Sequence, residues 1–301
     1  MKILLLGAKG QVGWELQRSL APLGLLKACD RQTVDLENLD KLQSTIRQYS
    51  PDFIVNAAAY TAVDRAESEP DKAQRINTEA VELLATEASN LDASLIHYST
   101  DYVFDGSKPT AYKEDDEPNP QSVYGHTKLD GEQAIRASGC NHLIFRTSWV
   151  YAARGSNFAK TMLRLAGERE ELKVVGDQIG APTSAELIAD ITALCLYRII
   201  QDREFGEEVT GTYHLAPSGE TNWCDYARYV VAQALKCGVS SRAEPDDIQP
   251  ITTSEYPVPA KRPANSRLDT TKLEDTFGVC LPAWQDQVKR LITELVMKDE
   301  P

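Results

Sequence analysis

The chain has 301 residues, of which 42% are hydrophobic and 26% are charged, enough for one large domain or two closely joined ones. Its formal net charge is -13 and it has no basic run, so binding to nucleic acid or to an anionic membrane surface is disfavoured. No apolar stretch reaches the ~18 residues that a membrane-spanning helix needs, and no membrane partner is expected.

The six cysteines form no CxxC pair and no spacing typical of a zinc site. Several lie in apolar runs, where a free thiol behaves as a small core residue. The first residues form a strand-like run rather than a cleavable signal pattern. A reducing, cytoplasmic setting is therefore expected.

A buried strand at residues 2–6 leads directly into the glycine turn 7–13, with the sequence GAKGQVG, and then into a helical pattern at residues 14–23. This order is the context of a dinucleotide-binding fingerprint. Its glycines let the backbone approach a pyrophosphate, and the helix N-terminus offers free amides. The alternative is a plain glycine-rich turn.

A second predicted strand at residues 25–30 ends in Asp30, and an acid at this point can bond the ribose hydroxyls of an adenosine. Arg31 follows, and an arginine there can instead favour a 2'-phosphate. The two signals conflict, so the choice between NADH and NADPH stays open. Asp35 and Leu36 begin the next turn, near where an adenine would lie.

Strands and helices continue to alternate up to about residue 150. Strands are predicted at residues 52–59, 94–100 and 142–147, and helices at residues 42–49, 70–91 and 124–137, with a loop at 105–121. This alternation predicts an α/β fold with a Rossmann-like doubly wound parallel sheet. Ligands of such sheets bind at the carboxyl ends of strands, so Ser99 and Thr100 are candidates for holding a substrate oxygen. The alternative is ordinary capping of a loop.

After residue 150 the pattern loosens. We expect a dinucleotide-binding domain in residues 1–150, to which residues 184–216 return, and a smaller α/β domain, mostly for substrate, in residues 151–301. Helices are predicted at residues 157–166, 186–200, 223–236, 268–278 and 284–297, and strands at 172–175 and 211–216. Residues 176–183 form a polar loop of the kind that contacts ligands, and the proline-rich residues 242–266 suit a lid or wall over a pocket.

Tyr124 and Lys128 stand four residues apart at the start of a predicted helix, so both side chains leave the same face. A phenol titrates near pKa ~10, and an ammonium one turn away favours the phenolate and lowers that pKa. The pair could therefore exchange a proton with a carbonyl or alcohol oxygen. The spacing also occurs by chance, with both residues merely exposed on a helix.

Three motifs together resemble the extended short-chain dehydrogenase/reductases: the GxxGxxG turn, STDYVF at residues 99–104 and YGHTK at residues 124–128. Five further runs resemble the dTDP-4-dehydrorhamnose reductase family, and the likeness covers nearly the whole chain. These runs are GQVG at 10–13, NAAAYTAVD at 56–64, FRTSWVY at 145–151, DQIGAPT at 177–183 and RPANSRL at 262–268. The resemblance implies reduction of the C4 ketone of dTDP-4-dehydro-L-rhamnose by NADH or NADPH, the last step of dTDP-rhamnose synthesis for cell-surface polysaccharide.

The resemblance also implies roles for single residues. Tyr124 would protonate the forming alkoxide, and Lys128 would lower the pKa of its phenol and hold the nicotinamide ribose. Thr100 would bond the sugar near the reacting oxygen, because strand alternation turns Ser99 to the other face. Asp101 would also contact the substrate.

Trp149 would form a wall for the sugar, although a core position is equally compatible with its sequence. Tyr60 stands where the family leads us to expect histidine. The implied cofactor-binding residues are Gly7, Gly10, Gln11, Val12, Gly13, Asp30, Asp35, Leu36, Ala59, Tyr60, Thr61, Tyr98, Tyr124 and Lys128. Family members often form homodimers with Mg2+ near interface glutamates, which Glu15, Glu186 and Glu294 would match; their alternative is to be solvated helix charges.

Two other functions stay open at this stage. A nucleotide-sugar epimerase or dehydratase would keep its NAD bound through turnover. A non-catalytic regulatory subunit would keep the fold without the chemistry, although retention of both Tyr124 and Lys128 speaks against it.

Overall fold

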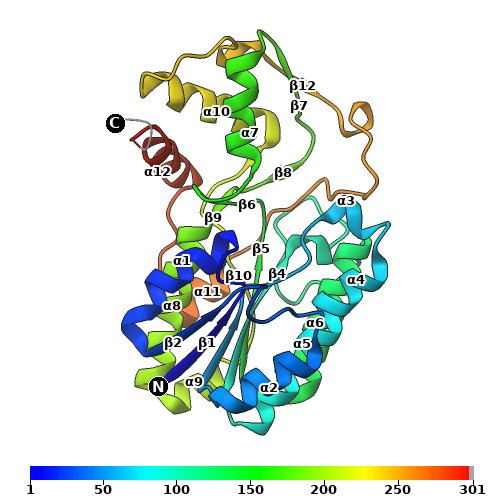
Figure 1. Ribbon diagram of the computed structural model, residues 1–301. Coiled ribbons are helices and arrows are strands. Elements are labelled where there is room, and N and C mark those ends of the chain that lie inside the picture. The colour runs from blue at the N-terminus through cyan, green and yellow to red at the C-terminus, as the bar shows by residue number, and fades with distance from the viewer. Residues whose placement is uncertain (298–301) are drawn as a thin grey trace.

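The computed structural model describes residues 1–297 and is organised around one six-stranded sheet (Figure 1). All neighbouring strands of this sheet run parallel, in the order β10-β5-β4-β3-β1-β2. The strands are β1 (Lys2–Leu6), β2 (Leu25–Cys29), β3 (Phe53–Asn56), β4 (Ser94–Thr100), β5 (His142–Thr147) and β10 (Gly211–His214). The predicted Rossmann-like parallel sheet is therefore confirmed, and β10 lies at its edge beside β5.

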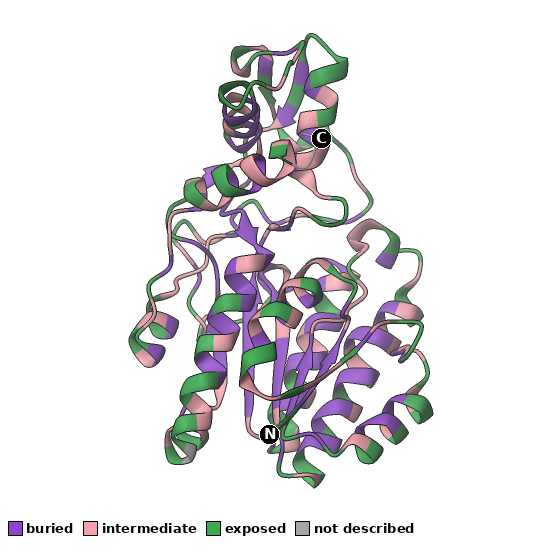
Figure 2. Ribbon diagram, turned by 60° about the vertical axis from the view of Figure 1, so that its left-hand side comes forward, coloured by how far each residue is buried: buried purple, intermediate pink, exposed green. Residues whose placement is uncertain are grey.

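Helices cover both faces of the sheet (Figure 1). One face carries α1 (Gln11–Leu20) and α8 (Ala185–Gln201), and the other carries α2 (Leu39–Tyr49), α5 (Ala80–Asn90) and α6 (Val123–Ser138). Figure 2 shows the strands buried between these layers. Successive side chains of a buried strand alternate between the two cores, so β4 sends Ile96 toward α8 and Leu95 toward α5.

The single helix predicted at residues 70–91 contains an irregular turn. It consists of α4 (Pro70–Gln74), a π-helical turn at Arg75–Glu79, and α5. The π turn carries the buried Asn77, whose side chain accepts from the Tyr60 amide at 2.8 Å and donates to the Thr127 hydroxyl at 3.2 Å. The hydrophobic pattern had predicted one continuous helix and did not reveal this turn.

The smaller part of the chain lies above the carboxyl ends of the sheet (Figure 1). It is built from α7 (Phe158–Glu168), α10 (Trp223–Lys236) and α12 (Trp284–Met297), which share a core that contains Tyr151, Tyr226 and Trp284. Its strands are short: β6 (Val150–Tyr151), β7 (Leu172–Val175), β8 (Ile179–Gly180), β9 (Thr183–Ser184), β11 (Thr221–Asn222) and β12 (Ile248–Ile251). Three further helices complete the described chain: α3 (Val63–Ala66), α9 (Arg203–Glu208) and α11 (Thr271–Phe277).

The sequence suggested that residues 242–266 are irregular, but part of this segment is regular. Strand β12 lies within them and pairs in parallel with β7, with Ile248 opposite Leu172. Only Ile248 of this strand is fully buried, and Pro250 stands in its middle, so the usual strand pattern is missing. Within residues 1–297, no helix is long and apolar enough to cross a membrane.

Candidate active site

The turn between β1 and α1 is closed so tightly that two of its glycines have no room for a side chain. Gly7 has φ +80°, and a Cβ on it would lie 2.7 Å from the Ala58 nitrogen. A Cβ on Gly13 would lie 2.1 Å from the Gly7 carbonyl oxygen. Gly10 begins α1 without a side-chain cap, which leaves the first helical amides available to an anion. The turn therefore fits a dinucleotide pyrophosphate.

The loop before α7 crosses this turn from the smaller part of the molecule. The Asn157 side-chain amide donates to Gln11 at 3.3 Å, and the Arg154 guanidinium lies 4.1 Å from the centre of the Trp14 ring. Val12 is partly buried against the core beneath the turn. Gln11 is thus the residue of the turn that reaches the opposite wall.

Ion pairs surround the carboxyl end of β2, where the adenosine of the cofactor is expected. Asp30 pairs with Lys9 of the glycine turn, and hydrogen bonds from Lys9 and Thr33 lower the pKa of Asp30 to about 2. The Arg31 guanidinium donates to Asp35 at 3.0 Å. The sequence analysis did not identify Lys9 as a site residue. Its position in the glycine turn, close to the strand that ends in Asp30, could have indicated it.

Leu36 lies beside this strand end with its side chain in the core between the sheet and α2, where it is 4% exposed. Beyond β3, Ala59 is half-buried and Thr61 is exposed. Tyr60 is fixed at both ends, because its amide donates to Asn77 and its hydroxyl donates to Glu69 at 2.6 Å.

The predicted proton donor stands at the beginning of α6, beside the end of β4. The Ser122 hydroxyl caps this helix by accepting from the Gly125 amide at 3.1 Å. Burial raises the pKa of Tyr124 to about 12, and a side-chain hydrogen bond with Thr100 opposes that rise. The Tyr124 ring also packs edge-to-face on Tyr102, with ring centres 5.6 Å apart.

Thr100 and Asp101 are both buried at the carboxyl end of β4. The Thr100 hydroxyl donates to Asp101 Oδ1 at 3.0 Å and accepts from the Tyr102 amide at 3.2 Å. Burial raises the pKa of Asp101 to about 6. Ser99 instead lies against Glu132 on the α6 side, as strand alternation predicts.

The Lys128 amine contacts two groups of β4. Its ammonium donates to the Tyr98 carbonyl oxygen at 2.7 Å and lies 2.8 Å from Nε2 of His97. Burial raises the pKa of Tyr124. The lowering of the phenol pKa by Lys128, which the sequence suggested, stays a prediction.

Tyr98 contributes its backbone to this arrangement, while its side chain belongs to the opposite face of the sheet. Its hydroxyl lies 2.8 Å from the Thr192 hydroxyl of α8, and burial raises its pKa. Its ring stacks on Phe145. The carbonyl oxygen of Tyr98 is thus the group that meets Lys128.

Trp149 lies between Trp223 and Gly180. The two indole rings stack with centres 3.7 Å apart, and a Cβ on Gly180 would lie 2.7 Å from the Trp149 ring. Trp149 also has a φ of 50°, a strained conformation for a bulky residue. One face of its ring is therefore occupied by Trp223, which the sequence analysis had not considered.

A cavity of about 590 Å³ opens beside Trp223 in the smaller part of the molecule. Its lining combines aromatic rings with four cationic side chains. These residues include Phe158, Trp223, Tyr256, Arg164, Arg169, Lys173 and Arg262. Rings suit a flat base, and guanidinium groups suit phosphates, so the lining fits a nucleotide. Residues 253–262 form one side, which agrees with the wall predicted for residues 242–266.

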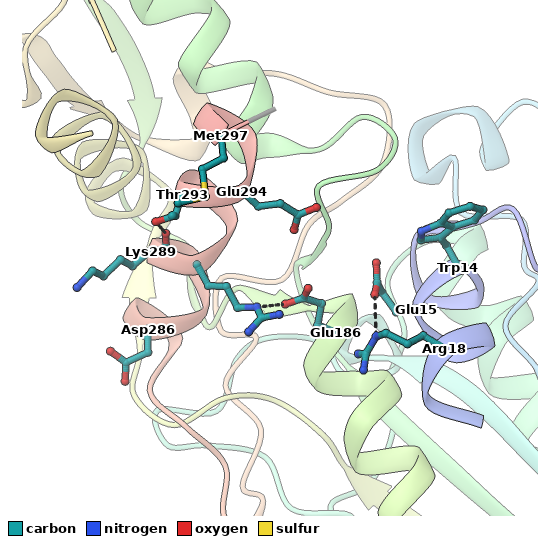
Figure 3. A pocket seen from close by; sticks show the side chains of 10 residues that line it. Trp14, Glu15, Arg18, Glu186, Asp286, Lys289, Thr293, Glu294 and Met297 are labelled. Carbon is teal, nitrogen blue, oxygen red and sulfur yellow. Dashed lines mark hydrogen bonds and ion pairs between the residues drawn. The ribbon is translucent and has the colours of Figure 1, made fainter. Parts of the chain in front are cut away.

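The three glutamates predicted for a metal come from α1, α8 and α12 and line one open pocket (Figure 3). Glu186 pairs with Arg290 at 2.8 Å, and burial and the charge of Glu186 raise the pKa of Glu15. Glu294 lies on α12 in the same pocket. Within the described part of the chain, no group of three or more His, Cys, Asp or Glu side chains is arranged to hold a metal ion. The three glutamates as placed do not form such a group, and Arg290 already pairs with Glu186.

The parallel sheet and the glycine turn at its carboxyl edge define a Rossmann-like α/β protein of the kind that binds dinucleotides. Comparisons with known proteins give the particular family. Residues 1–297 match the family model described as RmlD substrate binding domain, and the chain belongs to this family.

The relatives are similar over almost their whole length. The chain is 52% identical over 299 residues to the dTDP-4-dehydrorhamnose reductase of Escherichia coli strain K12, covering 98% of each chain. It is similar to the crystal structure of dTDP-4-dehydrorhamnose reductase from Bacillus anthracis in complex with NADP, with a TM-score of 0.86, 32% identity and coverage of 97% and 99%. A UDP-glucose 4-epimerase from Thermus thermophilus in complex with NAD has a TM-score of 0.79 at 16% identity and 99% and 100% coverage, a likeness of fold alone.

Proposed function

We propose that the protein reduces the C4 ketone of dTDP-4-dehydro-L-rhamnose to dTDP-L-rhamnose, the last step of dTDP-rhamnose synthesis for cell-surface polysaccharide. The observation that carries this proposal is the 52% identity to a dTDP-4-dehydrorhamnose reductase over 98% of both chains. The geometry supports it, because Tyr124, Thr100 and Asp101 meet at the sheet edge to which the glycine turn also leads.

A bound reduced nicotinamide supplies the hydride, and so both electrons, to C4 of the sugar. Tyr124 then donates its phenolic proton to the C4 oxygen, which becomes the product hydroxyl, and is left as a phenolate that recovers a proton from solvent. Thr100 holds the oxygen beside the phenol. A phenol titrates near pKa ~10, so the donor is protonated throughout the neutral range.

We propose that the cavity beside Trp223 takes the deoxythymidine diphosphate of the substrate. Its aromatic lining provides a face for the base, and its arginines and lysine provide positive charge for a diphosphate. Trp149 supports this wall through its stack on Trp223.

The cofactor is a nicotinamide dinucleotide, and we propose that both NADH and NADPH are accepted. Asp30 can bond ribose hydroxyls, while Lys9 beside it can pair with a 2'-phosphate. The Bacillus anthracis relative was crystallised with NADP. Gly7, Gly10, Gln11, Val12 and Gly13 would lie along the pyrophosphate, and Lys128 would face the nicotinamide ribose.

A homodimer is also proposed, through the open surface that carries the three glutamates and the exposed Trp14. All six cysteines are free, which supports a reducing, cytoplasmic location.

The test is an assay of purified protein with dTDP-4-dehydrorhamnose and either NADH or NADPH, in which the absorbance of the reduced nicotinamide is followed. The proposal predicts that one cofactor molecule is consumed for each sugar nucleotide reduced. Tightly copurified NAD with no net consumption would indicate an epimerase or dehydratase instead. Binding of the cofactor without turnover of any kind would indicate a regulatory subunit.

A further inference from the structure

Residues 152–157 join β6 to α7 and lie against the glycine turn. The Arg154 Nε donates to the Lys9 carbonyl oxygen at 3.4 Å. Gly155 has φ +76°, and a Cβ on it would lie 3.5 Å from Cγ of Gln11. The proposed function gives this segment no role, although it lies where the turn for the cofactor meets the smaller part of the molecule.

Asn157 connects the segment to the turn through both ends of its side chain. Its Oδ1 accepts from the Lys160 amide at 3.1 Å and so caps the N-terminus of α7. Its NH2 group donates to the Ala152 carbonyl oxygen at 2.6 Å and to Oε1 of Gln11 at 3.3 Å. An amide nitrogen has two hydrogens, so it serves both acceptors. A single side chain therefore links the position of Gln11 to the first turn of α7.

The segment is also bound to α7 itself. The Lys160 ammonium donates to the carbonyl oxygens of Ala153 at 3.0 Å and Gly155 at 2.8 Å. The Thr161 hydroxyl donates to the Asn157 carbonyl oxygen at 2.9 Å. These bonds join the segment and the first turn of α7 into one unit, so a displacement at the glycine turn is passed on to α7.

The first turn of α7 forms one wall of the cavity proposed for the deoxythymidine diphosphate. Phe158 follows Asn157 directly and lines this cavity, and its ring centre lies 4.6 Å from that of Trp223. Thr161 and Arg164 of the same helix line the cavity as well. A displacement of the first turn of α7 therefore changes the aromatic face that is offered to a base.

The other end of this connection lies at the cofactor site. Gln11 is the first residue of α1, whose uncapped amides fit a pyrophosphate. A bound pyrophosphate restrains the backbone of Gln11 and, with it, the contact to Asn157. Once one ligand has ordered this contact, the second ligand bears a smaller ordering cost, so the two ligands bind more tightly together than separately.

We propose that residues 152–157 couple the two binding sites. A dinucleotide at the glycine turn fixes Gln11, Gln11 fixes the first turn of α7 through Asn157, and dTDP then binds more tightly in the cavity beside Phe158. Asn157 is a positioning residue in this role, because it acts through Gln11 and α7. The inference rests on the proposed assignment of the cavity to dTDP, which the binding of dTDP alone tests separately.

The experiment is titration of the full-length protein with dTDP by isothermal titration calorimetry, with and without saturating NADP+. NADP+ should lower the Kd of dTDP by about 3- to 10-fold, and dTDP should lower the Kd of NADP+ by the same factor, because coupling is reciprocal. Equal Kd values with and without NADP+ would overturn the coupling and leave the proposed reductase intact. No binding of dTDP under either condition would overturn the cavity assignment and the coupling together.

The decisive variant is Asn157→Ser, which keeps a side-chain cap for α7 but removes the NH2 group. dTDP alone should bind as it does to wild type, and the effect of NADP+ on its Kd should fall below about 2-fold. A Kd for dTDP that rises by the same factor with and without NADP+ would show a purely structural role and overturn the proposal.

The matched control is Asn222→Ser. Asn222 caps α10 directly before Trp223, but its NH2 group donates to Asp225 at 2.7 Å and not to the glycine turn. The full effect of NADP+ on the Kd of dTDP should remain in this variant. Its loss there as well would overturn the proposal, because any cap beside the cavity would then have the same effect.

The contact with the turn is tested by Gln11→Met, which keeps the length of the side chain but offers no amide oxygen. The coupling between NADP+ and dTDP should fall as it does in Asn157→Ser, and the double variant should show no further fall. Additive losses in the double variant would overturn the proposal, because the two residues would then act independently.

Discussion

The sheet and the smaller part of the molecule each form half of the candidate site. The sheet does so mainly with backbone groups, and the smaller part mainly with side chains. At the sheet, the candidate groups are set largely by the backbone: a turn with no room for a Cβ at Gly7 and Gly13, the uncapped start of α1, and the Tyr98 carbonyl. In the smaller part, four of the strands have two residues each, and stacked side chains such as Trp149 on Trp223 shape the cavity. Backbone geometry suits chemistry shared by many proteins, whereas side chains suit recognition of one substrate.

The largest difference between the two halves of the site is expected from a variant that removes the phenolic oxygen of Tyr124. We expect Tyr124→Phe to lower kcat by about 10²- to 10⁴-fold, because the proton donor is lost, while the KM for the sugar nucleotide changes little. Steady-state kinetics measure both constants. Tyr102→Phe, which changes the neighbouring ring in the same way, should keep kcat within a few-fold, and a full loss there would contradict the assignment.

The two parts should also differ in how much an ion pair stabilises them. Glu132→Gln in α6 leaves the guanidinium of Arg146, which is 1% exposed, without its charge partner. We expect a loss of about 3–5 kcal/mol in the free energy of unfolding, measured by urea denaturation. The matched change Glu168→Gln on α7 removes an exposed pair with Arg164 and should cost about 1 kcal/mol or less.

The pH dependence of that stabilisation has a defined sign. Hydrogen bonds and charge from Arg146 outweigh burial and hold the pKa of Glu132 below its usual value. The folded state therefore binds the proton more weakly than the unfolded state, so the stabilisation is present above the unfolded pKa of ~4.5 and is lost as pH falls through the folded pKa. Equal acid sensitivity of wild type and Glu132→Gln would be incompatible with this contribution.

A change in the cavity of the smaller part should affect binding rather than chemistry. We expect Trp223→Ala to raise the KM for the sugar nucleotide by about 3- to 10-fold, because it removes an aromatic wall and the support of Trp149. Trp223→Phe should recover most of the affinity, since a ring remains. A drop in kcat with unchanged KM would place Trp223 at the chemistry instead.

The smallest expected effect concerns the adenosine end. Lys9→Ala should raise the KM for NADPH by about 2- to 5-fold and leave that for NADH nearly unchanged, because an exposed pair with a phosphate contributes about 1 kcal/mol or less. The paired kinetic measurement with both cofactors tests this. Lys27→Ala, on the neighbouring strand β2, is the control and should alter neither KM, whereas equal effects on both cofactors in Lys9→Ala would contradict a phosphate contact.

The sequence predicts the sheet better than the smaller part for a physical reason. Strands such as residues 2–6 and 142–147 are buried on both faces, and their continuous apolar runs are visible without a structure. Strand β12 has only Ile248 fully buried, and the two-residue strands have no periodicity at all. Their pairing depends on tertiary contacts that a local pattern cannot contain.

Within the site, too, sequence patterns predict local spacing but not contacts between distant segments. The spacing of Tyr124 and Lys128 predicts that both leave one face of a helix, but it cannot show that Lys128 meets His97 on a strand 31 residues away in the chain. Trp223 of α10 likewise meets Trp149, 74 residues earlier in the chain, only in the folded protein. The burial of Tyr124 and the partners of Lys128 arise from the fold, so the spacing alone could not reveal them.

The most direct measurement of the central claim is transfer of a label from the cofactor to the sugar. NADPH carrying deuterium in both positions at C4 of the nicotinamide is incubated with dTDP-4-dehydrorhamnose and the protein, and the product is examined by NMR and mass spectrometry. The account predicts dTDP-L-rhamnose with one deuterium at C4 of the sugar, and almost no labelled product with Tyr124→Phe. A converted sugar without deuterium at C4 would contradict it, because the hydride would then not pass from the nicotinamide to that carbon.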